Sequence, residues 1–351
     1  MKFHAKGKAM KPAKTILAVA MLALAGAGVG AADAPGLVSS ELIFERSAEL
    51  PSSHGSSVAS MPDGSIMAVW YSGSREAARD VAIWGSRLVD GKWSQPVVVF
   101  DTPDKPEGNP ALFVDRSGKV WMFFVTIHGL GWNWCKIKYI TSNDSGRTWS
   151  PVVILRDQRG WMTRNHALTL KDGRILLPLY SENLWATEFM ISADDGKSWQ
   201  FLAEVKSKPG NIQAAVVELD DGSLYSIMRT GAEKPKGKLW ESRSHDGGRT
   251  WAPASETVLP NPNAGADMIR LQSGKLLLAF NNSASGRSPL SLAVSEDGGK
   301  TWRIVRDVEN EPGKEFSYPS LCQAKDGVIH LTYTYRREAI KHVAFTEEWL
   351  K

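Results

Sequence analysis

The sequence predicts an all-β fold, a six-bladed β-propeller, because two short motifs repeat in phase along its 351 residues. The first motif, Ser-x-Asp-x-Gly-x-Thr/Ser-Trp, recurs at intervals of about fifty residues, in 142–149, 192–199, 244–251 and 295–302. The second is a two-residue turn that ends in glycine, with copies at Asp63-Gly64, Ser117-Gly118, Asp172-Gly173, Asp221-Gly222, Ser273-Gly274 and Asp326-Gly327. Six such turns indicate six structural units, and helical periodicity is absent before the last few residues.

Each glycine turn is expected to begin a tight hairpin, because glycine accepts a positive φ without steric cost. Apolar, strand-like runs follow the turns at 65–71, 119–125, 174–180, 223–228, 275–280 and 328–335. Another strand and then the Asp-containing turn are expected after each of them. In that turn the Ser and Asp side chains can bond the local backbone, and the Trp can pack between strands. We interpret the Asp turns as structural, since one per blade places them far apart around the rim.

A unit of about fifty residues with four short strands cannot bury both faces alone, so radial stacking of the units is expected to close a ring. The first Asp turn is degenerate, at residues 86–93, and the sixth is absent. This is expected where the two chain ends complete one blade together, and residues 42–45 and 342–345 are the predicted closing strands. Since no linker interrupts residues 33–351, we predict a single domain there.

Residues 1–32 have the pattern of a signal peptide. Five lysines precede the apolar run 16–29, and small residues end the segment. The pattern predicts cleavage after Ala32 and export to the periplasm or the outside of the cell. The apolar run is short and rich in glycine, which favours a cleaved leader over a stable membrane anchor.

Without this leader the chain is nearly neutral. The full sequence carries 42 basic and 38 acidic residues, and removing five lysines leaves 37 against 38, a net charge of about −1. A nucleic-acid partner therefore loses its electrostatic support. Cys135 and Cys322 fall in different repeats; two separate buried thiols are favoured over a disulfide, although export leaves a disulfide open. Because no metal-ligand spacing is present, we expect neither a metal nor another cofactor.

The Asp-turn repeats on this architecture resemble the Asp-box, or bacterial neuraminidase repeat, superfamily that includes the sialidases. The resemblance covers essentially all of the predicted mature chain. It is most specific for a bacterial branch of predicted neuraminidases, in segments 54–84, 107–124, 259–271, 286–302 and 315–343. It implies an exo-α-sialidase-like glycoside hydrolase that removes a terminal acidic sugar, such as sialic acid, from a glycan substrate.

Sialidases hold the sugar carboxylate with three arginines and use a tyrosine nucleophile, a glutamate that activates it, and an aspartate as acid/base. Bidentate guanidinium groups suit a carboxylate, and a neutral tyrosine meets less repulsion beside that anion than a carboxylate nucleophile would. By this resemblance Arg229 and Arg287 match two of the arginines, and Tyr318 matches the nucleophile. The three residues fall at equivalent positions of their blades. We therefore expect them to converge on one mouth of the central channel.

Three places depart from the sialidase pattern. His54 stands at the position of the first arginine, and Gln213, which cannot take a proton, stands where the activating glutamate is expected. The acid/base region, 72–84, offers Asp80 and Glu76 in a loop shorter than that of sialidases, and either carboxyl group is a candidate acid whose pKa the other raises. The carboxylate clamp is then expected to be incomplete and the tyrosine less activated.

Further polar and aromatic residues are expected near the same mouth. His54 and His166 each precede the first hairpin of a blade and are candidates for proton transfer. Asn109 is the comparable position of the second blade and, with Gln213, is a candidate for binding the substrate. One or two of the tryptophans outside the Asp turns are expected to stack on a sugar ring, the choice being open among Trp132, Trp134, Trp161 and Trp185.

Two alternative functions stay open at the level of sequence. The first is another carbohydrate reaction on the same scaffold, that of a rhamnosidase or a uronate lyase, with His54 or His166 and Tyr318 as acid and base. The second is a non-catalytic glycan-binding or assembly propeller, which the departures from the sialidase pattern favour. A propeller fold alone does not decide between them.

Overall fold

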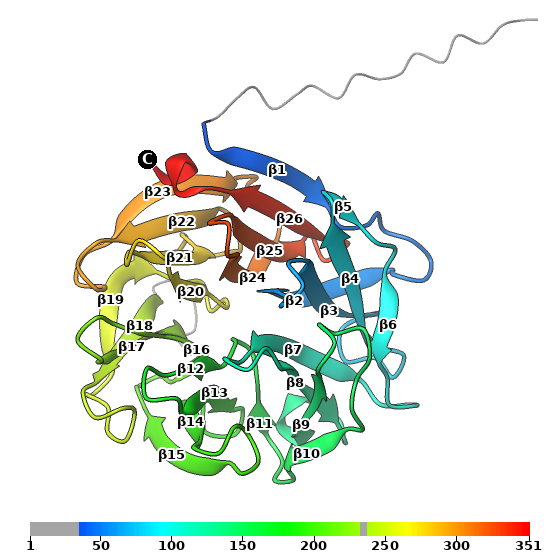
Figure 1. Cartoon of the computed structure of the whole chain (residues 1–351), viewed down its shortest axis with the longest axis horizontal. Helices are drawn as coiled ribbons and strands as arrows, with labels where there is room; N and C mark the ends of the chain where they lie inside the picture. The colour runs from blue at the N-terminus through cyan, green and yellow to red at the C-terminus, as the bar shows by residue number, and fades with distance from the viewer. Residues whose placement is uncertain (1–34, 232–236) are drawn as a thin grey trace, which may run out of the picture. The chain divides into compact units, whose positions relative to one another are not determined.

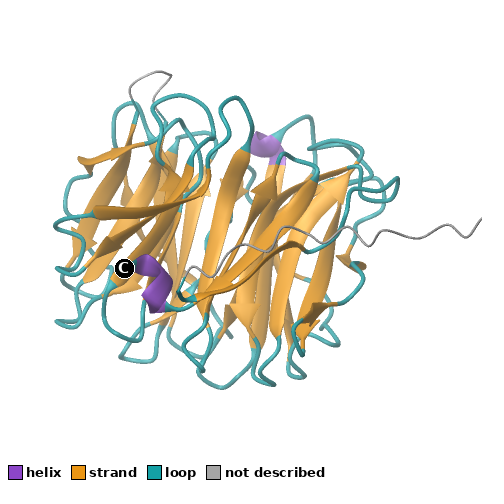
Figure 2. Cartoon of the chain, turned by 90° about the horizontal axis from the view of Figure 1, so that it is seen from above, coloured by secondary structure: helices purple, strands orange, loops and turns teal. Residues whose placement is uncertain are grey.

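The computed structural model describes residues 35–231 and 237–351, so the predicted leader, residues 1–32, lies outside the described residues. Within these residues six antiparallel sheets surround a central axis, as predicted (Figure 1). Figure 2 shows the same ring from another side, with the connecting loops gathered on its two faces. No helix in the described ranges is long and apolar enough to cross a membrane.

The first three blades follow the chain order. The first blade contains β2 (Ser52–Ser60), β3 (Ile66–Gly73), β4 (Ala82–Val89), β5 (Lys92–Trp93) and β6 (Val97–Phe100). The second contains β7 (Glu107–Val114), β8 (Val120–Ile127), β9 (Cys135–Ser142) and β10 (Val153–Arg156), with the short helix η1 (Trp132–Trp134) before β9. The third contains β11 (Trp161–Met162), β12 (Leu168–Thr169), β13 (Ile175–Ser181), β14 (Ala186–Ser192) and β15 (Gln200–Val205).

The remaining blades continue around the ring. The fourth contains β16 (Asn211–Glu218), β17 (Leu224–Thr230), β18 (Lys238–Ser244) and β19 (Ser255–Pro260). The fifth contains β20 (Asp267–Arg270), β21 (Leu276–Asn281), β22 (Leu290–Ser295) and β23 (Arg303–Glu309). The last contains β24 (Phe316–Gln323), β25 (Ile329–Tyr335), β26 (Ala339–Phe345) and the N-terminal β1 (Leu37–Leu42), and η2 (Glu347–Leu350) follows.

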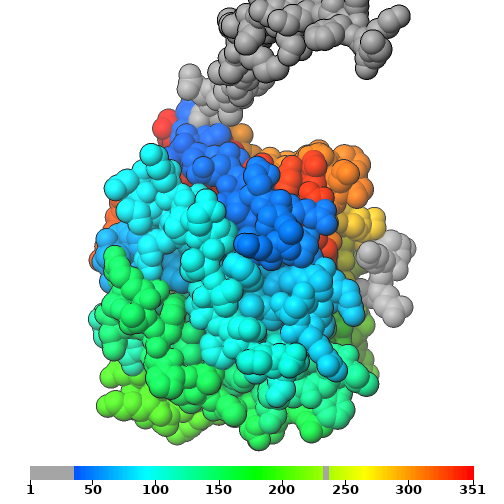
Figure 3. All heavy atoms as spheres, turned by 90° about the vertical axis from the view of Figure 1, so that its right-hand side faces the viewer, coloured from blue at the N-terminus to red at the C-terminus, as the bar shows by residue number. Residues whose placement is uncertain are grey.

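Both ends of the chain complete the last blade, as expected, but the N-terminal partner lies earlier than predicted. β1 pairs with β26 in antiparallel register, from Leu37 opposite Phe345 to Leu42 opposite Lys341, so residues 43–45 are outside the strand. Their apolar side chains pack instead: Ile43 is buried, and the Phe44 ring stacks on Trp70 at 4.9 Å. In Figure 3 the first described residues, in blue, lie beside the C-terminal residues in red.

The two sequence motifs act as predicted. All six turn glycines have φ between +80° and +93°. In the Asp turns the carboxylate is used within its own turn: Asp144 accepts hydrogen bonds from Ser142 Oγ and from the amide and hydroxyl of Thr148, at 2.6–2.9 Å. The same bonds recur at Asp194, Asp246 and Asp297. These contacts support the structural role of the Asp turns.

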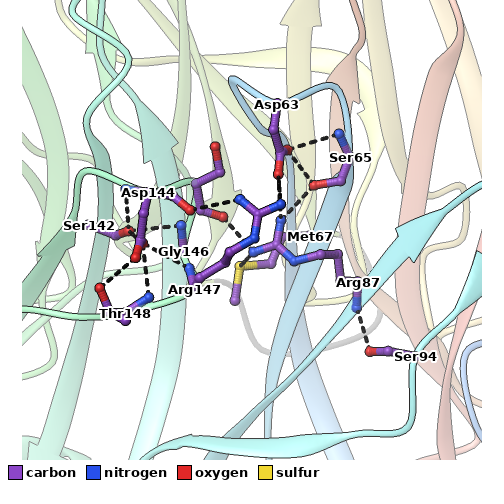
Figure 4. A network of polar contacts seen from close by, with 11 residues as sticks. Asp63, Ser65, Met67, Arg87, Ser94, Ser142, Asp144, Gly146, Arg147 and Thr148 are labelled. Atoms are coloured by element: carbon purple, nitrogen blue, oxygen red, sulfur yellow. Dashed lines mark hydrogen bonds and ion pairs between the residues drawn. The ribbon is translucent and has the colours of Figure 1, made fainter.

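The Asp turns also join neighbouring blades. Arg147, in the Asp turn of the second blade, pairs with Asp63 in the first hairpin turn at 2.7 Å, and Arg87 donates to the Ser145 carbonyl (Figure 4). In the same way Arg243 of the fourth blade donates to the Gly298 carbonyl in the Asp turn of the fifth blade. Apolar clusters between the sheets combine residues of adjacent blades, such as Val69 with Phe124. Each blade therefore buries a face against its neighbour, as the repeat predicted.

The two cysteines are free, Cys135 being buried and Cys322 partly buried, so the separate thiols favoured from the sequence are confirmed. Burial raises the pKa of Cys322 to about 12. Among the described residues no cluster of three or more His, Cys, Asp or Glu side chains is placed to hold a metal ion.

Two histidines of the last blade form a buried pair. His330 Nδ1 lies 3.0 Å from His342 Nε2, and the two rings stack at 12°. Burial lowers the pKa of His330 to about 4, and burial together with His330 lowers that of His342 to about 3. Both imidazoles are therefore neutral in the folded protein at neutral pH.

This pair predicts a loss of stability in acid. Below about pH 6.5 the unfolded chain binds protons that the folded pair does not, so the free energy of unfolding falls from there toward the folded pKa values. At pH 5 the cost is about 2 kcal/mol for one such imidazole. We expect His342→Phe to lose less stability than the native chain between pH 7.5 and pH 5 in denaturant titrations. The exposed His245, changed to Phe, is the control; equal pH slopes for all three proteins would contradict the prediction.

Candidate active site

A repeated backbone bulge aims side chains at one mouth of the channel. The innermost strands of four blades shift register at the same place, between His54/Ser57, Gly108/Ala111, Ile212/Ala215 and Ser317/Ser320. Inside each bulge one residue has a left-handed backbone: Gly55 (φ +63°), Asn109 (+46°), Gln213 (+58°) and Tyr318 (+53°). A left-handed φ is rare for residues other than glycine, and a bulge redirects the side chain that it carries. The three non-glycine residues line the same cavity.

The first blade presents glycine at this position, and this corrects the prediction for His54. A Cβ atom on Gly55 would lie 2.6 Å from Cε1 of Tyr71, whose ring takes that place. His54, one residue earlier, is 2% exposed, and both of its ring nitrogens are enclosed without a hydrogen-bond partner. Its ring packs against Tyr318 with centroids 4.5 Å apart, and burial, helped by surrounding arginines, lowers its pKa well below the usual value. His54 is therefore a neutral packing residue behind Tyr318, not an acid in the cavity.

The cavity has a volume of about 240 Å³, and all six blades contribute to its lining. Arg229, at the end of β17, donates from Nη1 to Tyr318 Oη at 2.9 Å and to Gln213 Oε1 at 3.1 Å. Its Nε donates to Asn263 Oδ1 at 2.6 Å. Arg287, in the loop between β21 and β22, pairs with a Glu315 oxygen at 2.7 Å. The two predicted arginines thus reach Tyr318 from separate blades.

A third guanidinium, that of Arg337, was not predicted from the sequence. Arg337 lies in the turn between β25 and β26; its Nε donates to Glu315 at 2.9 Å and its Nη1 pairs with Glu76. Arg336 and Arg337 have φ of +56° and +59°, a left-handed pair in a turn without glycine. The consecutive arginines in the Tyr-Arg-Arg-Glu turn were the sequence signal, but the pairing of Arg337 with Glu76 joins positions 261 residues apart.

Tyr318 sits in a strongly positive environment. The guanidinium carbons of Arg164, Arg287 and Arg229 lie 5.0, 5.2 and 6.0 Å from its ring centroid. Burial alone would raise the pKa of this phenol, but the charges of Arg229 and Arg287 outweigh burial and lower it below the usual value. The arginines therefore make Tyr318 easier to deprotonate than an ordinary tyrosine, although Gln213 offers no carboxylate.

The two predicted carboxyl groups of the 74–80 loop point to different places. Glu76 lines the cavity, accepts a hydrogen bond from the Tyr71 hydroxyl at 3.1 Å and pairs with Arg337. Asp80 lies outside the cavity, on the exposed side of the loop, where the amide and hydroxyl of Ser74 each donate to it at 2.9 Å. Burial opposes the change, but these bonds together lower the pKa of Asp80. Ala77, whose left-handed backbone has a φ of +60°, lies between the two carboxyl groups in the loop. Glu76 therefore faces the cavity, whereas Asp80 is not brought to Tyr318.

Glu182 is a carboxyl group of the cavity that sequence reasoning missed. It follows the last residue of β13, and its amide donates to the Gly160 carbonyl at 2.8 Å. Burial raises its pKa, while Arg229 and the Tyr180 hydroxyl partly oppose the rise. A single glutamate in a loop carries no sequence signal of this position.

His166 was predicted at the same mouth but lies elsewhere. It lines a second cavity, of about 480 Å³, and its Nδ1 is 3.7 Å from Asp267 Oδ1. The channel is occupied instead by Arg164, which is 2% exposed and donates to the carbonyls of Ser56 at 3.1 Å and Pro319 at 3.0 Å. Because the innermost strand of the third blade, β12, is only two residues long, the segment before it is free to place Arg164 there.

Two of the four tryptophans that were candidates for stacking on a sugar ring lie at the cavity. Trp132 and Trp185 line the cavity. Trp134 is covered by the Arg159 guanidinium at 4.0 Å, and Trp161 by that of Arg156 at 3.5 Å. The aromatic surface open to a ligand therefore comes from the 128–134 and 182–185 loops.

Comparisons with known proteins agree with this architecture. A family model described as the BNR repeat-like domain matches residues 64–331. A sialidase of Bacteroides fragilis (strain YCH46) is 24% identical over 335 residues, covering 82% of this chain and 60% of that protein, and an anhydrosialidase of Macrobdella decora is 26% identical over 230 residues, covering 57% and 29%. The chain thus spans 60% or less of the length of these curated relatives. The solved structure of the Hadza microbial sialidase Hz136 superposes with a TM-score of 0.73 at 19% identity, over 87% of this chain and 68% of that one, which shows a shared fold.

Proposed function

This chain belongs to the family of BNR repeat-like domains, within the sialidase superfamily, and on that premise we propose that it is an exo-α-sialidase-like glycoside hydrolase. Its substrate is a glycan that ends in an acidic sugar, sialic acid or a close relative. The single observation that carries the proposal is the meeting of three arginines with a tyrosine of lowered pKa in one cavity. The proposal includes export, on the pattern of residues 1–32.

The three guanidinium groups suit a sugar carboxylate. Within the described residues Arg229 makes no ion pair with a carboxylate, so its charge is available to the carboxylate of a substrate. Arg287 and Arg337 share Glu315, and Arg337 also pairs with Glu76, so these two carboxylates hold both arginines in place. A carboxylate between these arginines replaces water with charge-assisted hydrogen bonds. Arg337 thus supplies the third arginine that His54 does not.

The rest of the cavity fits one sugar residue. Its volume of about 240 Å³ is below the range of roughly 300–1,000 Å³ typical of drug-sized ligands, which favours a terminal residue over an internal one. Trp132 and Trp185 offer apolar surface, and Asn109 and Gln213 offer amides for sugar hydroxyls. Tyr318 then attacks the anomeric carbon, and water hydrolyses the resulting tyrosyl glycoside.

The geometry favours this function over the alternatives. A lyase or rhamnosidase that uses His54 or His166 needs an imidazole beside Tyr318 that can exchange a proton. His54 is enclosed, and His166 lines the other cavity. A non-catalytic glycan-binding propeller remains an outcome of the test.

The test is an assay of the purified protein on an aryl α-sialoside, a sialyl-lactose and a uronic-acid-capped glycan, with products identified by mass spectrometry. We expect turnover of the sialosides with release of a free or internally cyclised sialic acid. An unsaturated sugar that absorbs in the ultraviolet would indicate a lyase, and binding without turnover would indicate a non-catalytic propeller. Either outcome contradicts the proposed function.

A further inference from the structure

The cavity holds two carboxyl groups, those of Glu76 and Glu182, and their bonding partners differ. Both oxygens of Glu76 are occupied: Oε1 accepts from the Tyr71 hydroxyl, and Oε2 pairs with the Arg337 guanidinium. A carboxyl group whose two oxygens are both engaged has neither oxygen free to meet a leaving group. Glu76 therefore positions Arg337.

Glu182 stands on the wall formed by the third blade. Within the described residues it makes no ion pair. Along the chain it lies between Tyr180, in β13, and Trp185, in the loop after β13, and all three residues line the cavity. Its backbone is fixed by the hydrogen bond to Gly160 and by the turn that the Trp185 amide closes on Ser181. The charged and titratable groups near it are Arg229 on β17, Tyr180 on its own strand and Cys135 on β9.

The environment of Glu182 favours its protonated form. Burial raises the pKa of the carboxyl group, and the attraction of Arg229 and the Tyr180 hydroxyl reduces this rise without cancelling it. Cys135 is a thiol whose own pKa is raised well above its usual value by burial, so it adds no charge beside Glu182 at neutral pH. A general acid needs this combination of a raised pKa and access to the substrate cavity.

A line of polar contacts connects Glu182 to the nucleophile. Tyr318 Oη accepts from Arg229, which also donates to Gln213; Gln213 Nε2 in turn lies 3.3 Å from the Tyr180 hydroxyl, beside Glu182. The line follows the cavity wall from the last blade to the third. It keeps Tyr318 and Glu182 in one small cavity without direct contact, as an acid and a nucleophile that act on the same sugar require.

We propose that Glu182 is the general acid of the reaction, an assignment that rests on the sialidase-like function above. Tyr318 enters the first step as the phenolate, its proton having passed to solvent; its oxygen bonds to the anomeric carbon, and the bond from that carbon to the leaving oxygen breaks. The Glu182 proton moves to the leaving oxygen, which departs as a neutral alcohol. In the second step water attacks the anomeric carbon, its proton passes to the Glu182 carboxylate, and Tyr318 leaves as the phenolate. The protein returns to its starting state.

The test compares two leaving groups in Glu182→Gln. A sugar alcohol needs protonation to leave, whereas an acidic phenol leaves without it. We expect kcat/KM for sialyl-lactose to fall by about 10²- to 10⁴-fold, and kcat/KM for an acidic aryl sialoside to fall by less than about 10-fold. The basic limb of the pH profile for sialyl-lactose should also be lost. Glu256→Gln, an exposed position on β19, is the matched control.

The possible results separate this assignment from the function on which it rests. Equal losses on both substrates would overturn the acid role while leaving the sialoside activity of the native chain intact. No activity of the native chain on either sialoside would overturn both proposals. Thermal melting checks the fold of the variant. If Glu182→Gln does not fold, Glu182→Asp takes its place: because it keeps a proton on a shorter arm, its loss should again be larger for sialyl-lactose, and equal losses would overturn the role.

Discussion

Substitution of Tyr318 by phenylalanine is expected to lower kcat/KM for sialosides by at least about 10³-fold, because it removes the attacking oxygen and nothing else. The fold should persist, since the ring keeps its packing against His54 at 4.5 Å and loses only polar contacts of its hydroxyl, such as the hydrogen bond from Arg229. Steady-state kinetics on the aryl sialoside and on sialyl-lactose measure the effect. Both substrates should be affected, because Tyr318 attacks the same anomeric carbon whichever group leaves.

Tyr335→Phe is the matched control for this prediction. It removes the same phenolic oxygen from the last blade, at a residue that packs on Phe316 outside the cavity. Its kinetics should match those of the native chain. Turnover by Tyr318→Phe within about 10-fold of native would show that the reaction does not pass through this phenolate. The three arginines would then bind the sugar carboxylate in a reaction that does not use Tyr318 as the nucleophile.

The architecture was predictable because its signals are local. A glycine with positive φ, an aspartate that bonds its own turn and an alternating apolar run each report on a few neighbouring residues, and their period reports on the ring. The closing strand was misplaced by several residues because Ile43 and Phe44 are apolar for another reason, the contact with Trp70. Because the two ends of the chain pair with each other over a long separation, no local pattern distinguishes residues that form the closing strand from apolar residues that only pack beside it.

The convergence of Arg229, Arg287 and Tyr318 on one mouth was predictable from the resemblance to sialidases, but the expected equivalence of their blade positions is wrong. Arg229 lies near the end of β17, Arg287 lies in the loop after β21, and Tyr318 lies in the bulge of the innermost strand β24. His54 lies one residue before the bulge position, which is Gly55. In a strand a shift of one residue changes the face on which a side chain lies, so the imidazole does not reach the cavity. Arg337 depends on a left-handed turn and on a partner in the first blade, which spacing in the sequence cannot express.

The departures from the sialidase pattern also compensate for one another in the folded chain. An arginine absent at position 54 is matched by Arg337, which is held by Glu76 of the first blade and by Glu315, next to the last blade. A glutamine at position 213 removes a base, but Arg229 and Arg287 lower the pKa of Tyr318 without one. A motif comparison scores each departure as a loss, because it compares positions one at a time. The cavity depends on the charges that meet there.

Arg229→Ala is expected to lower kcat/KM by about 10²- to 10³-fold, since losing one partner of a desolvated charge pair costs about 2–5 kcal/mol. Two effects contribute. The substrate carboxylate loses a guanidinium, and Tyr318 loses both a donor at 2.9 Å and a charge that lowers its pKa. Arg229→Lys should recover only part of the loss, because a point charge does not reproduce the planar fork. Arg303→Ala, exposed on β23, controls for the change in net charge.

A substrate in which the carboxylate is replaced by a carboxamide separates the two effects. If Arg229 binds the carboxylate, the native chain should prefer the acid over the amide strongly, and Arg229→Ala should show a much smaller preference, so that the two changes are not additive. The effect through Tyr318 is felt equally by both substrates, because the attacking oxygen is the same. An Arg229→Ala variant that keeps the native preference for the acid would therefore assign Arg229 to the activation of Tyr318 and leave the carboxylate to Arg287 and Arg337.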